Sequence, residues 1–322
     1  MANEENIKLL TDAGLSQNDA EVVVDCFETA DLYGVTTHGI SMLPSYLERI
    51  KCGGYNLHPD IRIINETPAF ALVDGANGIG SVVANFCMNY AIRRSKDVGI
   101  FTVLSRNNNT FGPAFYYPLK AAEQGMIGLI CSNSPAQMAP VGGIDKMLGT
   151  NPFAAVIPVP GTDPIIIDMA TSVVAKSKFK EYRERGLLLP EGWALDKNGN
   201  PTTDPNEAIQ GLVLPMAGYK GYGIAMLIDI LAGVLSGAAF LNHVGRFYDS
   251  CNKSMDVGFF VVSISPKVVL GDSYDRMISE FVTDLRNSHT LKNKIISLPG
   301  DDRIRYKNEK TRKNSKAHSD FQ

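Results

Sequence analysis

Apolar residues stand at helical spacing near the start of the chain. Between Ser16 and Tyr33 they recur every three or four positions, at Ala20, Val23, Val24, Phe27 and Ala30. This spacing predicts an amphipathic helix, with Ser16 placed to cap its start and Gly34 to end it. A second helix is predicted from Met42 to Lys51. Residues 1–55 are therefore expected to be mostly helical.

Beyond residue 60, short apolar runs typical of strands alternate with helical patterns. Strands are predicted at 61–64, 70–73, 100–104, 127–131 and 259–264, and a hairpin at 154–158 and 165–168. Helices are predicted at 81–97, 114–124 and 275–285, and a polar loop that carries Trp193 at 191–205. Such alternation indicates an α/β fold.

Two further stretches differ in composition. Residues 221–240 are apolar over about the length of a membrane span. Because Asp229 and four glycines interrupt them, we expect a helix packed on all sides in a large core instead. Residues 301–322 contain seven Lys or Arg, four Asp or Glu and almost no apolar residue. That composition predicts a disordered tail rather than a basic binding arm.

Composition and charge narrow the possible partners. With 322 residues, of which 44% are hydrophobic, the chain can bury a sizeable core, and two domains are expected. A net charge of −3 argues against a nucleic-acid partner. The opening residues are polar and acidic, which indicates no secretory leader, so we expect a cytoplasmic protein with no membrane partner. The five scattered cysteines lack a CxxC pair and favour buried thiols over a disulfide framework or a metal site.

Three glycines between a predicted strand and a predicted helix resemble a dinucleotide-binding loop. They are Gly75, Gly78 and Gly80, spaced as GxxGxG rather than GxGxxG. The GxGxxG order supplies a tight turn and then a close backbone approach to pyrophosphate, which the permuted order does not guarantee. We therefore interpret this segment as a plain turn.

The strongest candidate chemistry lies in Thr37-His38, on a short turn flanked by glycines. Histidine exchanges protons readily near neutral pH, although a lone histidine is more often a packing or capping residue. Further segments follow in order: Asn109–Gly112, Gly149–Pro152, Asp168–Ser172, Pro201–Pro205 and Lys220–Gly223. Together these segments resemble the type-2 malate/L-lactate dehydrogenase family, from about Leu15 to about Gly300.

This resemblance implies NAD or NADP as the cofactor, bound on an α/β domain that is not the usual Rossmann fold. We expect that domain to span 69–269. A smaller helical domain is expected to span 1–68 and to be joined by 270–300, followed by the tail at 301–322. The resemblance also implies a homodimer with its active site near the subunit interface.

Site residues follow from the same resemblance. His38 matches the proton donor, supported by Thr37, and Lys178 matches a position that helps to set active-site protonation, although by itself it could equally be a solvated helix lysine. The positions that match cofactor contacts are Ser134, Asp168, Met169, Ala170, Thr171, Lys220, Gly221 and Gly300.

The secondary structure predicted around two of these cofactor segments allows more than one interpretation of each. Asp168–Ser172 follows a strand and is expected to start a helix, which would either meet a phosphate or be an ordinary capped helix start. Gly218–Gly221 ends a loop and begins the apolar helix, where Lys220 could meet phosphate charge or be solvated.

The substrate positions are Met42, Asn109 and Thr110, and two of them depart from the family pattern. The family has an arginine at Met42, which can hold a carboxylate bidentately, and a histidine at Thr110. A later family arginine aligns near Met255. The predicted site is therefore less cationic than the family pattern.

The sequence thus predicts an NAD(P)-dependent dehydrogenase acting on CH–OH donors, with a small 2-hydroxy or 2-oxo acid as substrate and malate or lactate by default. One alternative is the reduction of a cyclic imine acid. Another is a degenerate member that binds nucleotide, or only dimerises, without turnover. The choice between NAD and NADP stays open, because no ribose-reading acid or arginine can be placed.

Overall fold

The computed structural model describes residues 2–319, and the side chains of residues 3–313. Its N-terminal part is helical, as predicted: α1 (Ala2–Asp12), α2 (Gln17–Leu32) and α3 (Leu43–Lys51). The Ser16 side chain accepts a hydrogen bond from the amide of Asp19, so it caps α2 as expected. These helices share a small core that includes Leu10, Phe27 and Tyr46.

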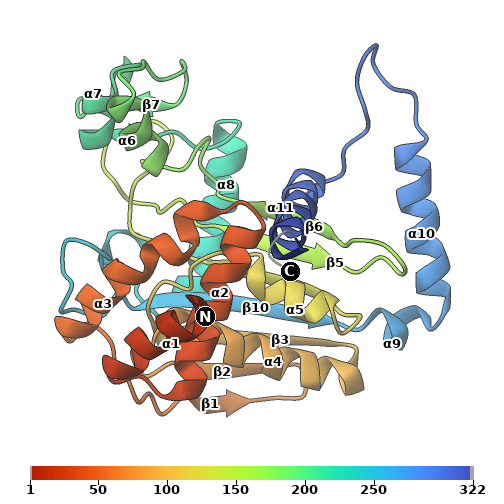
Figure 1. Cartoon of the computed structure of the whole chain (residues 1–322). Helices are drawn as coiled ribbons and strands as arrows, with labels where there is room; N and C mark the ends of the chain where they lie inside the picture. Colours follow the sequence, from red (N-terminus) through yellow and green to blue (C-terminus); the bar gives the residue numbers. More distant parts are fainter. Residues whose placement is uncertain (1, 320–322) are drawn as a thin grey trace.

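A seven-stranded sheet forms the centre of the molecule (Figure 1). Its strands are, in spatial order, β1 (Arg62–Glu66), β2 (Phe70–Asp74), β3 (Ile100–Asn108), β10 (Val257–Ile264), β4 (Ile127–Ser132), β5 (Phe153–Ile157) and β6 (Ile165–Met169). Only β2 and β3 pair in parallel, and the predicted hairpin is the antiparallel pair β5–β6. The predicted α/β class is confirmed, on a sheet unlike the parallel one of doubly wound folds.

Helices cover both faces of this sheet. On one face, α4 (Gly80–Val98) and α5 (Tyr116–Ala122) pack against β3, β10, β4 and β5. On the other face, a π-helical turn, η3 (Asp229–Val234), lies over β10. There a Cβ on Gly258 would overlap Ala232 O, so only glycine permits this close approach.

A small lobe stands beside the sheet and has its own core of residues such as Phe179, Ala208 and Val213. It contains α6 (Ser177–Glu184), β7 (Ala194–Leu195), β8 (Pro201–Thr202), α7 (Pro205–Gln210) and β9 (Leu212–Val213), seen at the upper left of Figure 1. The polar loop predicted over 191–205 therefore includes two short strands.

The apolar stretch 221–240 differs from its prediction. It forms α8 (Tyr219–Ile228), which continues into η3, and one side of it lies open rather than packed in a core. Leu227 is 53% exposed, Ile230 45% and Val234 52%. Among the residues that the structure describes, no helix is long and apolar enough to cross a membrane.

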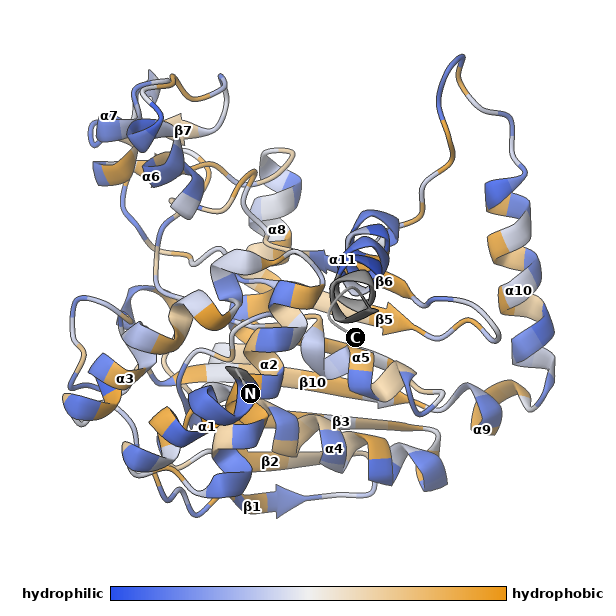
Figure 2. Ribbon diagram, viewed as in Figure 1, coloured by the Kyte–Doolittle hydropathy of each residue, from blue (hydrophilic) through white to orange (hydrophobic). Residues whose placement is uncertain are grey.

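The C-terminal part differs from its prediction in two ways. After α9 (Pro266–Leu270), α10 (Ser273–Arg286) stands away from α1–α3 in Figure 1 and buries none of its residues. Residues 270–300 therefore do not join the N-terminal helices within one chain. Figure 2 shows apolar positions alternating with polar ones along α10.

Residues 301–319 of the tail form a helix, α11 (Asp301–Ser319), so the prediction of disorder is wrong for them; residues 320–322 lie outside the described residues. Ile304 is buried, the Tyr306 ring lies against Gly34, and Lys310 Nζ donates to Asp31 O at 3.1 Å. A few contacts to α2 thus order a segment whose composition alone could not form a core.

Two cysteines also depart from prediction. Cys52 and Cys251, 199 positions apart, form a disulfide. The remaining three, Cys26, Cys87 and Cys131, are buried thiols as expected. Folding brings Cys52 and Cys251 together, and no cysteine-spacing motif predicts a pair so far apart in the sequence.

Candidate active site

The turn that carries His38 is built by two short 3₁₀ helices, η1 (Thr36–His38) and η2 (Ile40–Met42). Asp31, near the end of α2, accepts a hydrogen bond from the amide of Ile40 at 2.9 Å. A Cβ on Gly39 would lie 1.9 Å from the Asp31 carboxylate, so glycine is required beside the histidine. The turn is therefore fixed by local hydrogen bonding.

His38 is held by its neighbour and lies near a positive charge. Its Nδ1 lies 3.0 Å from the hydroxyl of Thr37, and its Nε2 has no partner among the described side chains. The side chain is open to solvent in the single chain. Even so, loss of hydration on the protein side, and then repulsion by Arg303, lower the pKa of His38 from the usual 6.5. A neutral imidazole is therefore favoured at neutral pH.

Arg303, in α11, connects this histidine with a predicted cofactor residue. Its Nη2 lies 2.8 Å from a carboxylate oxygen of Asp168, at the end of β6. The guanidinium also lies over the Phe115 ring, 5.1 Å from its centre, and Nη1 is buried without a hydrogen-bond partner. Burial raises the pKa of Asp168, and Arg303 partly offsets the rise.

The predicted cofactor positions near Asp168 and Gly300 meet in space. The amide of Ile166, in β6, donates to Pro299 O at 3.0 Å. A Cβ on Gly300, whose φ is +95°, would lie 2.7 Å from the Cβ of Ile166. The segment 299–300 therefore packs closely on β6, and this contact places Arg303 beside Asp168.

A second set of predicted cofactor positions is joined by hydrogen bonds. The amide of Ser134 donates to Asn151 Oδ1 at 3.0 Å, and the Asn151 side chain donates to Ala225 O in α8. Thr171 donates to Thr150 O, and its own carbonyl accepts from Met216, whose carbonyl accepts from Gly221. Ser134, Thr171 and Gly221 thus belong to one framework, while Met169 is 40% exposed beside it.

The two predicted helix starts have different outcomes. The segment 168–172 does not start a helix: β6 ends at Met169, Ser172 bridges Pro215, and α6 begins only at Ser177. Ala170 lies in this irregular stretch. The second start is confirmed, since α8 begins at Tyr219 after Gly218. Among the first amides of α8, that of Gly221 donates to Met216 O, while those of Tyr219 and Lys220 have no acceptor within the helix, and the Lys220 side chain is exposed beside them.

Asn109, predicted to touch substrate, is a buried framework residue instead. Its amide nitrogen donates to Asn77 and Gly78. Its oxygen accepts from Arg49 and from the amide of Met255. Both ends of the amide are therefore occupied, and Asn109 links the segment 77–78 to Arg49 and Met255. Met255 is buried as well.

The substituted positions lie nearer the surface. Thr110 is half-buried, and its carbonyl accepts from the Tyr46 hydroxyl at 3.5 Å. Met42 is half-buried, with its sulfur 3.9 Å from the Tyr248 hydroxyl. Neither position supplies a charge.

Lys178 is not brought to His38 within the chain. It lies on α6 in the small lobe and pairs with Glu181 at 2.6 Å, with 47% of its side chain exposed.

The glycines at 75, 78 and 80 serve packing. A Cβ on Gly75 would lie 2.0 Å from Asn108 Oδ1, and one on Gly80 would lie 2.1 Å from Asn109 O. These contacts account for the glycines without a bound phosphate.

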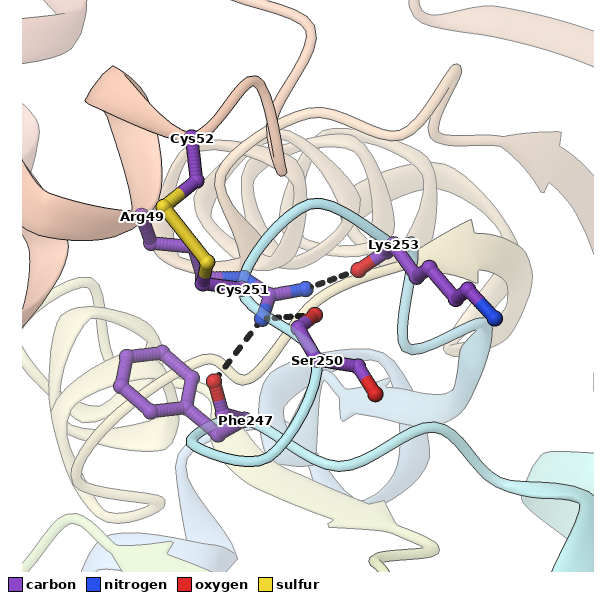
Figure 3. Close-up of a disulfide and its surroundings, with 6 residues drawn as sticks. All are labelled: Arg49, Cys52, Phe247, Ser250, Cys251 and Lys253. Atoms are coloured by element: carbon purple, nitrogen blue, oxygen red, sulfur yellow. Dashed lines mark hydrogen bonds between the residues drawn. A yellow bond between two sulfur atoms is a disulfide. The ribbon is translucent and has the colours of Figure 1, made fainter.

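The loop that contains Tyr248, whose hydroxyl lies near Met42, is held in place by Arg49 and by a disulfide (Figure 3). Arg49, which is 1% exposed, donates to the carbonyls of Phe247, Ser250 and Lys253. Close by, the Cys52–Cys251 disulfide ties α3 to the same loop. Among the described residues no carboxylate pairs with Arg49, so carbonyls and the Tyr55 and Phe247 rings solvate its charge.

Sequence reasoning missed Arg303 and Arg49. Arg303 lies in a segment that was expected to be disordered. The one local sign that this segment packs against the protein is the pair of apolar residues Ile304 and Tyr306. Arg49 has the outward appearance of a solvated helix residue, and nothing in its spacing marks it as buried.

A cavity of about 530 Å³ opens elsewhere, between α2 and α4, lined by residues that include Asn18, Asn85 and Arg93. None of the residues tied to His38 lines it, so we assign it no part in the chemistry.

The chain is similar over most of its length to known proteins. The family described as malate/L-lactate dehydrogenase matches residues 2–319. The chain is 41% identical over 290 residues to a malate dehydrogenase of Pyrococcus horikoshii, covering 88% of this chain and 80% of that protein. It is 36% identical over 299 residues to an NAD(+)-dependent ureidoglycolate dehydrogenase of Escherichia coli O157:H7, covering 92% and 83%. The solved structure of a sulfolactate dehydrogenase of Methanocaldococcus jannaschii superposes with a TM-score of 0.90 at 37% identity, covering 95% of this chain and 89% of that one.

Proposed function

Because the chain belongs to the malate/L-lactate dehydrogenase family, we propose that it interconverts a small 2-hydroxy acid and its 2-oxo acid, with His38 exchanging the proton. The chain is an NAD(P)-dependent dehydrogenase of hydroxy acids, as its sequence predicts. The single observation that carries the role of His38 is its fixed imidazole, with Nδ1 beside Thr37 and Nε2 free.

The proton chemistry follows from the state of the imidazole. When the Thr37 hydroxyl donates to Nδ1, the neutral ring carries its proton on Nε2; when it accepts, Nε2 is free to take a proton from a carbinol. The lowered pKa keeps His38 neutral at pH 7, which favours the proton-accepting role in hydroxy-acid oxidation. In the reverse direction the imidazolium returns that proton to the keto oxygen.

The donors in place fit a dinucleotide. The open end of α8, with exposed Lys220, suits phosphate oxygens. Ser134, Thr171 and Gly221 form the adjoining framework. The bound nicotinamide would supply the hydride chemistry, and the chain would supply position and proton exchange.

Malate is the substrate that we propose first, with lactate second. Met42 and Thr110 lack the charges of the family pattern, and the retained His38 speaks for an active enzyme. A turnover screen with malate, lactate and a cyclic imine acid, each with both nucleotides, tests this proposal. Turnover of the imine acid alone would favour the alternative reaction. Nucleotide binding without turnover of any acid would favour the degenerate member.

We further propose a homodimer, supported by apolar surface on two elements. The exposed side of α8 and η3 carries Leu227, Ile230, Val234 and Leu235. The α10 helix adds Met277, 51% exposed, and Phe281, 56% exposed. Apolar surface of this extent commonly marks a protein interface.

The dimer is tested with Leu227→Asp and Phe281→Asp. Each places a charge at the proposed interface, so light scattering should show a monomer at micromolar concentration, whereas the parent should be a dimer. The matched control is Lys197→Asp, on an exposed turn. A parent that is monomeric at this concentration would contradict the proposal. We also propose a cytoplasmic location; the Cys52–Cys251 disulfide argues against it, because disulfides are rare in reducing compartments.

A further inference from the structure

The Cys52–Cys251 disulfide lies near the surface, whereas the other three cysteines are enclosed. Both bonded cysteines are half-buried. Cys26 and Cys87 are each 0% exposed, and Cys131 is 3% exposed. A partly exposed disulfide is open to attack by a thiol in solution, and such disulfides are the more easily reduced ones. A reductant in solution therefore acts on one pair, while the three thiols stay shielded.

Contacts other than the sulfur–sulfur bond also hold these two cysteines together. Their Cα atoms are 5.8 Å apart, within the usual range for a disulfide. A Cβ on Gly54 would lie 2.0 Å from Cys251 O, so only glycine lets the turn after Cys52 approach the loop so closely. Arg49 donates to backbone carbonyls on either side of Cys251 (Figure 3). These contacts do not depend on the disulfide, so a reduced pair stays placed to form it again.

The loop that carries Cys251 reaches the His38 turn. The Tyr248 hydroxyl lies 3.9 Å from the sulfur of Met42, in η2, which begins two residues after His38. The Tyr248 ring meets the Phe247 ring edge-on, with 4.8 Å between their centres. Phe247 packs in turn on Tyr46 of α3, with ring centres 5.6 Å apart. The loop that the disulfide ties to α3 is therefore in direct contact with the turn that carries the proposed catalytic histidine.

Little packing holds the middle of this loop. Over 246–253, five residues are exposed, at 246, 248, 249, 252 and 253, and the other three are half-buried. Segments with few buried apolar contacts open at little cost in free energy. The covalent bond therefore contributes much of the order of this stretch. The fold itself has three apolar clusters in a chain of 322 residues and does not need a disulfide for its core. Disulfides that do form in reducing compartments mostly serve catalysis or redox sensing.

We propose that Cys52–Cys251 is a reversible redox site that adjusts substrate binding at the His38 turn. When oxidised, it holds Tyr248 against Met42; when it is reduced, the loop moves more freely and the hydroxy acid binds more weakly. This inference rests on the proposed function for placing the substrate beside His38.

The co-reactant is a dithiol. One of its thiolates attacks a sulfur of the pair and forms a mixed disulfide, which releases the other cysteine as a thiolate. The second thiol of the reductant then displaces the first cysteine. Two electrons and two protons pass to the cysteines, and the reductant leaves as a cyclic disulfide.

The parent protein tests the proposal in its two redox states. After denaturation, a thiol reagent should count three thiols in the oxidised protein and five after dithiothreitol. Reduction should raise KM for the hydroxy acid about 10-fold, because one or two loop side chains must then be ordered on binding. Nucleotide affinity should not change, since the described hydrogen bonds that join Ser134, Thr171 and Gly221 involve no residue of 246–253. Removing dithiothreitol and adding oxidised glutathione should restore the low KM.

Two variants separate this effect from other actions of the reductant. Cys52→Ser with Cys251→Ser should have the high KM and no response to dithiothreitol. The matched control is Cys131→Ala, which removes a buried thiol and should keep the response. Should the double variant fail to fold, the change of the parent on reduction decides, because it needs no substitution.

The remaining outcomes are distinct. Equal KM values in the two redox states overturn the redox site, and so does a response that the double variant retains. A parent that forms no disulfide with oxidised glutathione, or an equal fall in nucleotide affinity on reduction, also overturns it. A protein that turns over no acid in either state overturns the proposed function instead. Hydrogen–deuterium exchange of residues 36–42 then decides on the redox site: faster exchange after reduction upholds it, and unchanged exchange overturns it.

Discussion

Replacing Arg303 by methionine should destabilise the protein in a way that depends on pH. The substitution removes the cation beside Asp168 and keeps most of the apolar stem over Phe115. The Asp168 side chain is 13% exposed and that of Arg303 is 27% exposed. Asp168 would therefore remain as a largely buried carboxylate without its partner.

The magnitude follows from this burial. Leaving one partner of a buried pair unpaired costs about 3–5 kcal/mol, and the partial exposure of Arg303 reduces this to about 2–3 kcal/mol. With an unfolding entropy of about 2.1 cal/mol/K per residue, a chain of 322 residues should melt about 3–4 °C lower. Circular dichroism at pH 7.5 measures the shift.

The sign of the pH dependence is fixed by Asp168. Burial already raises its pKa, and Arg303 acts in the opposite direction. Without Arg303 the folded-state pKa rises further above that of the unfolded chain, so the native state takes up a proton more readily on acidification. The difference in melting temperature between parent and variant should therefore be largest at neutral pH. It should shrink as the pH falls through the raised pKa of Asp168.

Two further variants make this test specific. Asp168→Asn combined with Arg303→Met should recover much of the loss and show little pH dependence. Arg286→Met removes a more exposed pair with Asp301, at 2.9 Å, and should cost at most about 1 kcal/mol. A melting temperature of Arg303→Met within 1 °C of the parent, or an equal drop at pH 5 and pH 8, would refute the reasoning.

Three other outcomes are expected. His38→Gln should lower kcat by about 10²–10⁴-fold with little change in nucleotide affinity, and near-normal turnover would remove His38 from the mechanism. Because loss of hydration on its protein side, and then repulsion by Arg303, lower the pKa of His38, hydroxy-acid oxidation should persist below pH 6.5 and be lost as the pH falls through that lowered pKa; Arg303→Met should move this limb to higher pH, and an unmoved limb would contradict the coupling. Cys52→Ser with Cys251→Ser should lower the free energy of unfolding by up to about 5 kcal/mol, as loop closure over 199 positions predicts, and an unchanged melting curve for the parent under reducing agent would speak against the disulfide.

Hydropathy periodicity located most of the elements. The helix after Ser16, the strands at 70–73 and 100–104, and the hairpin over 154–168 all form near their predicted bounds. These patterns are local, because a side chain's direction in a helix or strand follows directly from its position in the sequence. The motif around His38 and those that follow it also identified the family, because their residue types and order can be recognised without knowledge of the fold.

Hydropathy periodicity did not predict the C-terminal helix, α11. Residues 301–313 are mostly polar, and their order comes from the burial of Ile304 in the main core, from Tyr306 against Gly34 and from Lys310 bonded to Asp31 of α2, which no local pattern encodes. Arg303 therefore entered the site only once α11 was placed between α2 and β6.

Other site assignments also depended on tertiary contacts. Asn109 reads as a substrate residue in its motif, but its amide is satisfied by Asn77, Arg49 and Met255, which lie up to 146 positions away. Cys52 and Cys251 became a pair for the same reason. The sequence determined which helices and strands form and to which family the chain belongs, because both depend on local sequence patterns. The tertiary structure decided which charges and amides are already partnered, because a buried polar group takes its partners from wherever the fold brings them.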